Sequence, residues 1–287
     1  MATYEDVDIF DVMKHMDIRD AIKLSLTDRR AYLISQTDMF WRFFLKRDYP
    51  LFVIDKDENL QSAYRKIDAN RNVKEVTMKP GETFEQFKYH QNIDTFICKN
   101  IELKSLVGCP PCRILNCNRN RLTSLVGCPP NVKELDCDSN LLTSLVGCPP
   151  NLEKLFCDNN RLTSFVGCPP SVRILYFNDN RLTSFIGCPA NIKKLYCSSN
   201  QLISLNGCPQ DLEELYCDDN QLTSLVGCPE SVKILFCFDN QLQTLDIYLP
   251  QIRDIDYENN PLIHPWDQYL RQKIIDIMRN PDYHQLN

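Results

Sequence analysis

The most reactive side chains in this 287-residue chain are its 15 cysteines, the first of which is Cys98. Cys109 and Cys112 have the Cys-x-x-Cys spacing of a redox or zinc motif, and Cys117 follows closely. A thioredoxin-type motif requires a strand that leads into a helix, whereas the residues between these two cysteines are both proline, which is incompatible with a helix. Cys109 also occupies a position that recurs along the chain, each time before proline. We therefore expect a packing role here, and no redox or metal site.

No other group of residues has the spacing of a catalytic site. The four histidines, His15, His90, His264 and His284, lie in separate segments, and none has a cysteine or carboxylate at ligand or triad spacing. Almost all glycines belong to a repeated Gly-Cys-Pro turn, so no phosphate-binding loop is present. The sequence therefore predicts a protein that is not an enzyme and that needs neither a cofactor nor a metal.

Composition limits the partners and the compartment. The formal net charge of −6 argues against a nucleic-acid partner, which usually selects a basic face. No stretch approaches the ~20 apolar residues of a membrane span, and the acidic N-terminus lacks the pattern of a secretory signal. An odd number of cysteines at fixed intervals fits free, buried thiols in a reducing compartment. We expect a cytoplasmic or nuclear protein with no membrane partner.

Copies of one short unit position the cysteines. Residues 122–140 read LTSLVGCPPNVKELDCDSN and residues 142–160 read LTSLVGCPPNLEKLFCDNN. The recurring pattern L-x-x-L-x-C-x-x-N-x-L resembles the leucine-rich repeat, with cysteine at the second inward strand position. Nine units are counted by their strand centres, which are Phe96, Leu115, Leu135, Leu155, Leu175, Leu195, Leu215, Leu235 and Ile255. The fold predicted for this region is a leucine-rich-repeat solenoid with a parallel sheet.

Each repeat position has a physical role. Side chains alternate faces along a strand, so Leu155 and Cys157 should point inward while Phe156 and Asp158 point outward. The Gly-Cys-Pro-Pro segments make the return limbs extended and non-helical. An asparagine follows each strand, where a buried amide can satisfy the backbone of adjacent coils. These are Asn120, Asn140, Asn160, Asn180, Asn200, Asn220, Asn240 and Asn260.

The outward face of the sheet is the candidate partner-binding site. Its central column contains five consecutive aromatic residues, Phe156, Tyr176, Tyr196, Tyr216 and Phe236, and the neighbouring columns contribute Asp138, Asp158, Asp218 and Asp219. Exposed aromatic groups are enriched at protein interfaces. We predict a protein target that inserts an apolar or aromatic element and places basic residues against the aspartates. The alternative is that cross-strand stacking merely stabilises the sheet.

Residues 1–50 do not follow the repeat pattern, and their apolar residues occur at helical spacing. Four pieces resemble the F-box: residues 7–16, residues 18–26, Arg29–Tyr32 and Asp38–Trp41, with Val7-Asp8-Ile9 where the family usually has Leu-Pro. By that resemblance, the residues that contact or support a Skp-type adaptor would be Ile9, Met16, Ile18, Ile22, Leu24 and Trp41. The whole layout is similar to F-box/leucine-rich-repeat proteins, and the short cysteine- and proline-rich repeats are similar to those of giant DNA viruses.

The resemblance implies an adaptor function. An F-box docks the Skp-type adaptor of an SCF-type cullin–RING ubiquitin ligase, and the repeats would hold the protein to be ubiquitinated, in the host cytoplasm if the chain is viral. Two alternatives stay open. The N-terminal helices could form only a cap over the first coil, and the chain could be a stand-alone scaffold or decoy that binds one protein without recruiting a ligase.

The expected fold class is α+β, in four segments. Residues 1–50 form the F-box-like helical unit, and residues 51–91 form a helical or irregular connector. That connector contains a helix at residues 62–67 and a candidate first strand at residues 73–78. Residues 92–262 form the solenoid. Residues 263–287 contain an amphipathic stretch expected to be a helix that caps the last open edge of the sheet.

Overall fold

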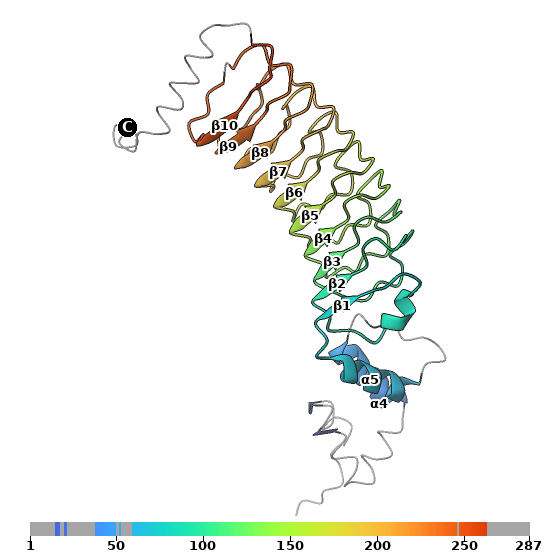
Figure 1. The fold of residues 1–287 in the computed structure, drawn as a ribbon. Helices are drawn as coiled ribbons and strands as arrows, with labels where there is room; N and C mark the ends of the chain where they lie inside the picture. The colour runs from blue at the N-terminus through green and yellow to red at the C-terminus, as the bar shows by residue number, and fades with distance from the viewer. Residues whose placement is uncertain are drawn as a thin grey trace, which may run out of the picture.

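The computed structural model describes residues 15–17, 20–21, 38–49, 52, 59–245 and 247–262. Most of these residues form a curved solenoid, with strands along the inner side of the curve and return limbs along the outer side (Figure 1). The strands form one parallel ten-stranded sheet in sequence order. Each strand therefore bonds only to the strands before and after it in the chain, as stacked repeats require.

All the strands are short. They are β1 (Glu75–Thr77), β2 (Thr95–Ile97), β3 (Ile114–Asn116), β4 (Glu134–Asp136), β5 (Lys154–Phe156), β6 (Ile174–Tyr176), β7 (Lys194–Tyr196), β8 (Glu214–Tyr216), β9 (Ile234–Phe236) and β10 (Asp254–Asp256). The nine centres counted from the sequence all fall in strands. The sheet also extends one strand further, because β1 lies in the segment predicted as connector and pairs Val76 with Phe96. The candidate strand at residues 73–78 is thereby confirmed.

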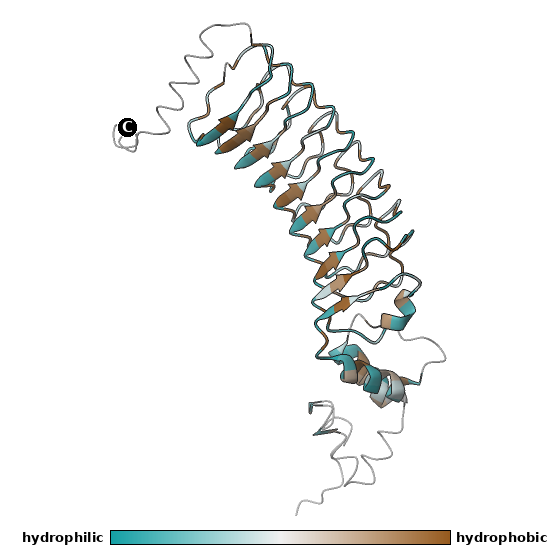
Figure 2. Cartoon of the chain, viewed as in Figure 1, coloured by the Kyte–Doolittle hydropathy of each residue, from teal (hydrophilic) through white to brown (hydrophobic). Residues whose placement is uncertain are grey.

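The inward columns form one continuous core. Leu155 and Cys157 are fully buried, and the equivalent residues of the neighbouring coils are buried with them. Figure 2 shows the apolar residues recurring at every strand of the sheet. The alternation predicted from the repeat is confirmed, since Phe156 and Asp158 lie on the other face and are half-buried.

The asparagine column links neighbouring coils. The Asn180 amide nitrogen donates to the carbonyl oxygens of Cys157 at 3.0 Å and Asn178 at 3.0 Å, and its Oδ1 accepts from the backbone N–H of Leu162 at 3.0 Å. Cys157 and Leu162 both belong to the coil that precedes Asn180. The same arrangement recurs at the other asparagines of the column, from Asn140 to Asn260. The predicted role of this column is therefore confirmed.

The return limbs contain no helix from residue 99 to residue 245, as the prolines predicted. A turn opens each regular limb, for example where the N–H of Cys128 donates to the carbonyl oxygen of Leu125 at 3.0 Å, with Gly127 at φ +93°. Glycine is also required there by close packing between coils. A Cβ built on Gly167 would lie 2.3 Å from the backbone carbon of Leu145.

Among the described residues, α-helices precede β1 and a 3₁₀ helix lies between β1 and β2. α4 (Asp38–Asp48) and α5 (Leu60–Asn70) share a core of their own, in which Phe40, Phe44 and Ile67 are buried. The 3₁₀ helix η1 (Phe84–Phe87) packs its phenylalanines against Phe96 of β2. α5 confirms the helix predicted at residues 62–67.

Other helical predictions lie largely or wholly outside the described residues. These include most of the three earlier F-box pieces and the C-terminal cap at residues 263–287. Among the helices that the structure describes, none has the length and apolar character needed to cross a membrane.

Candidate protein-binding face of the sheet

Five aromatic side chains form a stacked ladder on the inner face of the curve; we call Phe156, Tyr176, Tyr196, Tyr216 and Phe236 the aromatic ladder. Ring centroids of successive members lie 4.6, 4.2, 4.5 and 4.9 Å apart. The first three contacts are nearly parallel, with interplanar angles of 18°, 2° and 16°, whereas Phe236 is turned by 70°. In-register parallel pairing produces the stack, because it sets equivalent residues side by side.

Stacking determines which parts of the aromatic rings a partner can contact. The faces of the inner rings are covered by their neighbours, so the exposed parts are ring edges and tyrosine hydroxyl groups. The hydroxyl of Tyr196 lies 3.4 Å from Oε2 of Glu214, and burial raises the pKa of this phenol above its usual value. The ladder is consequently a semi-polar ridge that is suited to contacts with side chains and backbone of another polypeptide.

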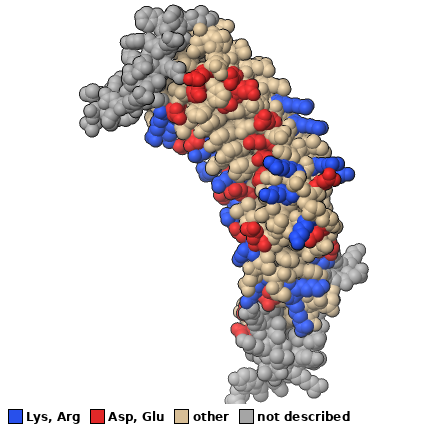
Figure 3. All heavy atoms as spheres, viewed as in Figure 1, with Lys and Arg blue, Asp and Glu red and all other residues tan. Residues whose placement is uncertain are grey.

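We call the side of the sheet where the chain enters each strand the upstream side. Charged side chains on this side form ion pairs with one another. Lysine and arginine side chains there pair with carboxylates of neighbouring coils. The pairs are Arg113–Asp94, Lys133–Glu153, Lys154–Glu134, Lys193–Asp211, Lys194–Glu214 and Lys233–Glu213. Figure 3 shows blue and red side chains alternating along this margin. The upstream side therefore has little unbalanced charge to attract a partner.

We call the side where the chain leaves each strand the downstream side. Its first outward-facing column, which follows the buried cysteine, forms hydrogen bonds with the backbone of the next coil. Oδ1 of Asp138 accepts from the N–H of Asp158 at 2.7 Å, and Oδ1 of Asp158 accepts from the N–H of Asn178 at 2.7 Å. Burial, followed by the charges of Asp136 and Asp158, raises the pKa of Asp138 to about 7. Two of the four aspartates predicted to meet a partner thus also hold neighbouring coils together, a role that the sequence had not suggested.

Beyond this column, the downstream side carries exposed aspartate side chains. Asp218 is half-buried and accepts a hydrogen bond of 2.6 Å from the Ser198 hydroxyl, while Asp219 is exposed and accepts one of 2.9 Å from Ser199. Asp179 and Asp239 are exposed as well. We call these four residues the downstream aspartates. None of them takes part in an ion pair within the described part of the chain. Figure 3 shows acidic side chains gathered at the end of the solenoid that carries β8, β9 and β10.

No protein-family model matches the sequence, and no curated protein matches it significantly. Solved structures do match. YopM from Yersinia enterocolitica WA-314 is 23% identical with a TM-score of 0.52, covering 77% of this chain and 54% of that one. The chain has the leucine-rich-repeat fold. A leucine-rich-repeat protein of Leptospira interrogans gives 20% identity and a TM-score of 0.55, covering 73% of this chain and 60% of that one.

The functional domain of InlJ from Listeria monocytogenes, which includes a cysteine ladder, gives 19% identity and a TM-score of 0.55, covering 68% of this chain and 50% of that one. This chain therefore spans about half to three fifths of the length of these three structures. In the leucine-rich-repeat solenoid described here, cysteine likewise forms a column, with Cys137 and Cys157 in adjacent coils and fully buried.

Those leucine-rich-repeat cysteines are packing residues in the geometry that the structure shows. All 15 are free thiols. Burial raises the pKa of Cys137, of Cys157 and of the other strand cysteines, so little reactive thiolate is present near neutral pH. The thiol of Cys109 donates to the carbonyl oxygen of Pro110 at 3.8 Å, and the neighbouring Cys112 thiol, followed by burial, raises the pKa of Cys109. Within the described ranges, no cluster of histidine, cysteine or carboxylate side chains is arranged to hold a metal.

The structure places two of the six F-box-like residues. Trp41 is only 4% exposed and packs with ring centroids 5.0 Å from Phe40 and 5.8 Å from Tyr64. Met16 is half-buried against the same core, and its carbonyl oxygen accepts from Arg47 at 2.9 Å. Ile9, Ile18, Ile22 and Leu24 lie outside the described residues. Trp41 is thus placed to support the helical unit from within.

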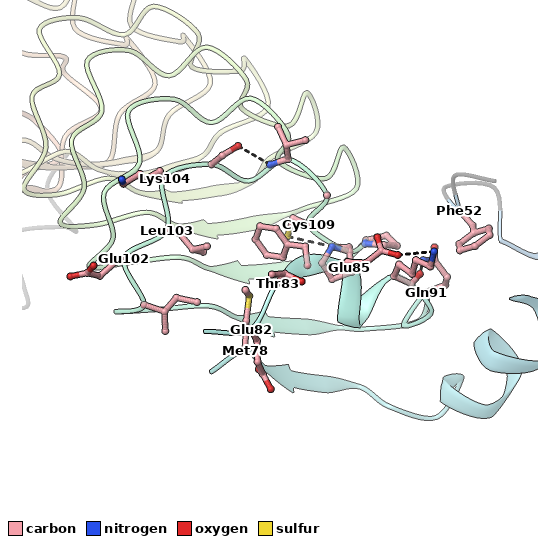
Figure 4. A pocket seen from close by; sticks show the side chains of 18 residues that line it. Phe52, Met78, Glu82, Thr83, Glu85, Gln91, Glu102, Leu103, Lys104 and Cys109 are labelled. Carbon is pink, nitrogen blue, oxygen red and sulfur yellow. Dashed lines mark hydrogen bonds and ion pairs between the residues drawn. The ribbon is translucent and has the colours of Figure 1, made fainter. Parts of the chain in front are cut away.

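A hollow of about 750 Å³ lies between η1 and the return limb of the first coil (Figure 4). Its lining includes Met78, Phe84, Leu103 and Cys109. The lining is mixed apolar and charged, and its Lys88 and Glu85 side chains form an ion pair of 2.7 Å. It forms where the first coil departs from the regular repeat, with Glu102 at φ +62°. We assign it no chemical role.

Proposed function

We propose that this leucine-rich-repeat chain is a non-catalytic adaptor that holds a protein target on the inner face of its sheet. The observation that carries the proposal is the aromatic ladder, a continuous run of stacked rings on the solvent side of the sheet. Protein interfaces are enriched in tyrosine and phenylalanine, and energetically dominant contacts cluster at their centres.

Position and curvature support this use of the ladder. The strands line the inner side of the curve, so the face can follow a rounded or extended partner (Figure 1). Stacking within the sheet explains part of the aromatic content, since cross-strand aromatic pairs stabilise a sheet by about 0.2–1 kcal/mol each. It does not require aromatic side chains in five successive coils, because Asn116 and Asp136 occupy the same column in the two coils before the ladder.

The experiment is affinity capture from an extract with full-length wild-type chain and a Tyr196→Ser/Tyr216→Ser variant, followed by mass spectrometry. We expect a specific partner to be lost from the variant. A Val146→Ser/Val166→Ser variant is the control, because these side chains are exposed on the outer return limbs. Unchanged recovery by the tyrosine variant, with intact circular dichroism, would refute the proposal.

We further propose that the N-terminal helices recruit a Skp-type adaptor and a cullin, which would make the chain a substrate receptor of an SCF-type ubiquitin ligase. Support comes from the F-box resemblance and from the helical unit immediately before the sheet, where Trp41 lies in the core with Met16 packed against it. In this proposal the ligase acts in the cytoplasm, which is the host cytoplasm if the chain is viral, or in the nucleus.

The test mixes purified full-length chain with a purified Skp-type adaptor, with a known F-box protein as positive control. Complex formation on size-exclusion chromatography is the expected result. If target capture succeeds while no adaptor or cullin binds, the chain is instead a stand-alone leucine-rich-repeat scaffold or decoy. This outcome separates the two functions cleanly.

A further inference from the structure

The inner face is electrically one-sided. On the upstream side, six ion pairs join lysine or arginine to carboxylates of neighbouring coils. On the downstream side, Asp179, Asp218, Asp219 and Asp239 have no ion-pair partner within the described residues. The aromatic ladder runs between a neutralised margin and an acidic one. Arg161 and Arg181 also lie on the downstream side, but Gln221 and Gln241 replace them further along, so a partner on the ladder meets unbalanced negative charge beside β8 and β9.

The acid is concentrated at one end of that margin. The carboxylates of Asp219 and Asp239 lie close enough to Asp218 to raise its pKa, after burial as the main cause. The pKa of Asp138, in contrast, is raised to about 7 by burial and by neighbouring carboxylates, so it is only partly charged at neutral pH. Effective negative charge is consequently greatest beside β8 and β9, where a cation would relieve the mutual repulsion of the aspartates.

Apolar surface widens at the same place. Phe236, the last ring of the ladder, is turned by 70° from Tyr216, and Phe238 follows it two residues later on the same face. Both phenylalanines are half-buried. In the equivalent column, the preceding coils carry polar residues such as Ser198 and Asp218. Aromatic surface bordered by carboxylates suits the alkyl stems and cationic heads of lysine and arginine.

We infer that the segment held on this face is a basic, extended polypeptide that runs along the solenoid axis, with its lysine or arginine side chains against the downstream aspartates. This inference rests on the proposed target-binding function and specifies the partner's chemistry. The aspartates from Asp179 to Asp239 span three coil spacings, or roughly 14 Å at about 4.8 Å per strand. An extended chain covers that distance in four to five residues at about 3.3 Å each. Two or three alternate basic side chains then fit the acidic margin.

The experiment uses full-length protein and two fluorescein-labelled nonapeptides, one of alternating arginine and leucine and one of alternating glutamate and leucine. Fluorescence anisotropy at 50 mM NaCl should show the arginine peptide binding at least about tenfold more tightly, and 300 mM NaCl should weaken that binding. Equal affinity for the two peptides would overturn the inference.

Paired variants locate the charge. Asp219→Asn/Asp239→Asn should weaken binding of the arginine peptide about tenfold, as expected for loss of two partly exposed charge contacts. Both residues have left-handed backbone, with φ of 51° and 52°, which asparagine tolerates, and Asn259 already occupies this position at φ 54°. The variant should therefore fold normally, as circular dichroism will check.

Glu153→Gln/Asp211→Asn is the matched control, since it removes the same charge from the upstream side. It should change peptide affinity less than twofold. An equal loss in both variants would mean attraction by net charge alone and would overturn the inference. A natural partner that is lost from the Tyr196→Ser/Tyr216→Ser variant but retained by the downstream variant would also overturn it, while the proposed function would stand.

Discussion

Replacing Asn180 with alanine tests how the coils are held together. The substitution leaves the buried N–H of Leu162, now 3.0 Å from the Asn180 Oδ1, without a partner. It also removes one of two amide donors to the carbonyl oxygen of Cys157, which keeps a bond of 3.2 Å from Asn160. An unsatisfied buried polar group costs about 1–3 kcal/mol. One such group, together with the lost second bond to Cys157 and the small cavity left behind, predicts a loss of about 2–3 kcal/mol in the free energy of unfolding.

Asn260→Ala is the matched control. Asn260 makes equivalent bonds, to the N–H of Leu242 at 2.9 Å and the carbonyl oxygen of Cys237 at 3.0 Å, but it is half-buried near the end of the described sheet. Water can replace part of what is lost there, so the expected cost is about 1 kcal/mol.

Urea unfolding followed by circular dichroism measures both variants. Repeat arrays can lose two-state behaviour. The Asn180→Ala substitution, in the middle of the array, should therefore also broaden or split the unfolding transition, whereas Asn260→Ala, near its end, should not. If Asn180→Ala costs less than about 1 kcal/mol, or no more than Asn260→Ala, the amides do not hold adjacent coils as inferred.

Three further predictions concern pH, packing and thiol reactivity. The pKa of Asp138, about 7 in the fold and ~3.9 unfolded, means that the folded state keeps the proton longer, so stability should fall as pH rises between these values. Asp138→Asn should remove this loss, stabilising the protein by about 1–2 kcal/mol at pH 8 after allowance for solvent contact, and by nearly nothing at pH 4; thermal melts at both pH values check it. Gly167→Ala should cost at least about 2 kcal/mol more than Gly187→Ala in urea unfolding, because both have positive φ but only Gly167 has backbone within 3 Å of the new Cβ. Iodoacetamide at pH 8 should leave Cys157 unmodified in the native protein and alkylate it in urea, because burial raises its pKa and blocks access; rapid native alkylation would contradict its place in the core.

The inward architecture was predictable because the repeat period sets the register directly. Once Leu155 is placed inward, the equivalent leucine of each coil follows, and so do Cys157 and Asn160. β1 was harder to recognise from the repeat, since Val76 is not followed by the cysteine and asparagine of a regular unit. Within residues 73–78, only Val76 and Met78 alternate with polar residues, and pairing with β2 confirms the strand.

The outward side was predictable in position but not in bonding. The sequence placed the aromatic column correctly, because alternation in a strand has a fixed period. It could not show that Asp158 bonds the backbone of the next coil, since that depends on strands only three residues long, after which the chain turns over its neighbour. The uneven pairing of charge across the face also depends on contacts between coils, and single columns of sequence do not reveal it.

The asparagine column has a mechanical consequence. Each amide fastens its own coil to the preceding one, and each strand bonds only to its sequence neighbours. Force applied to the two ends should therefore peel the solenoid one coil at a time, with the amide contacts breaking in succession. Each released coil of 20 residues would lengthen the chain by about 7 nm at ~3.6 Å per residue. The coils therefore resist force in series, so the resistance of the solenoid to stretching is set by its weakest coil and not by the size of the sheet.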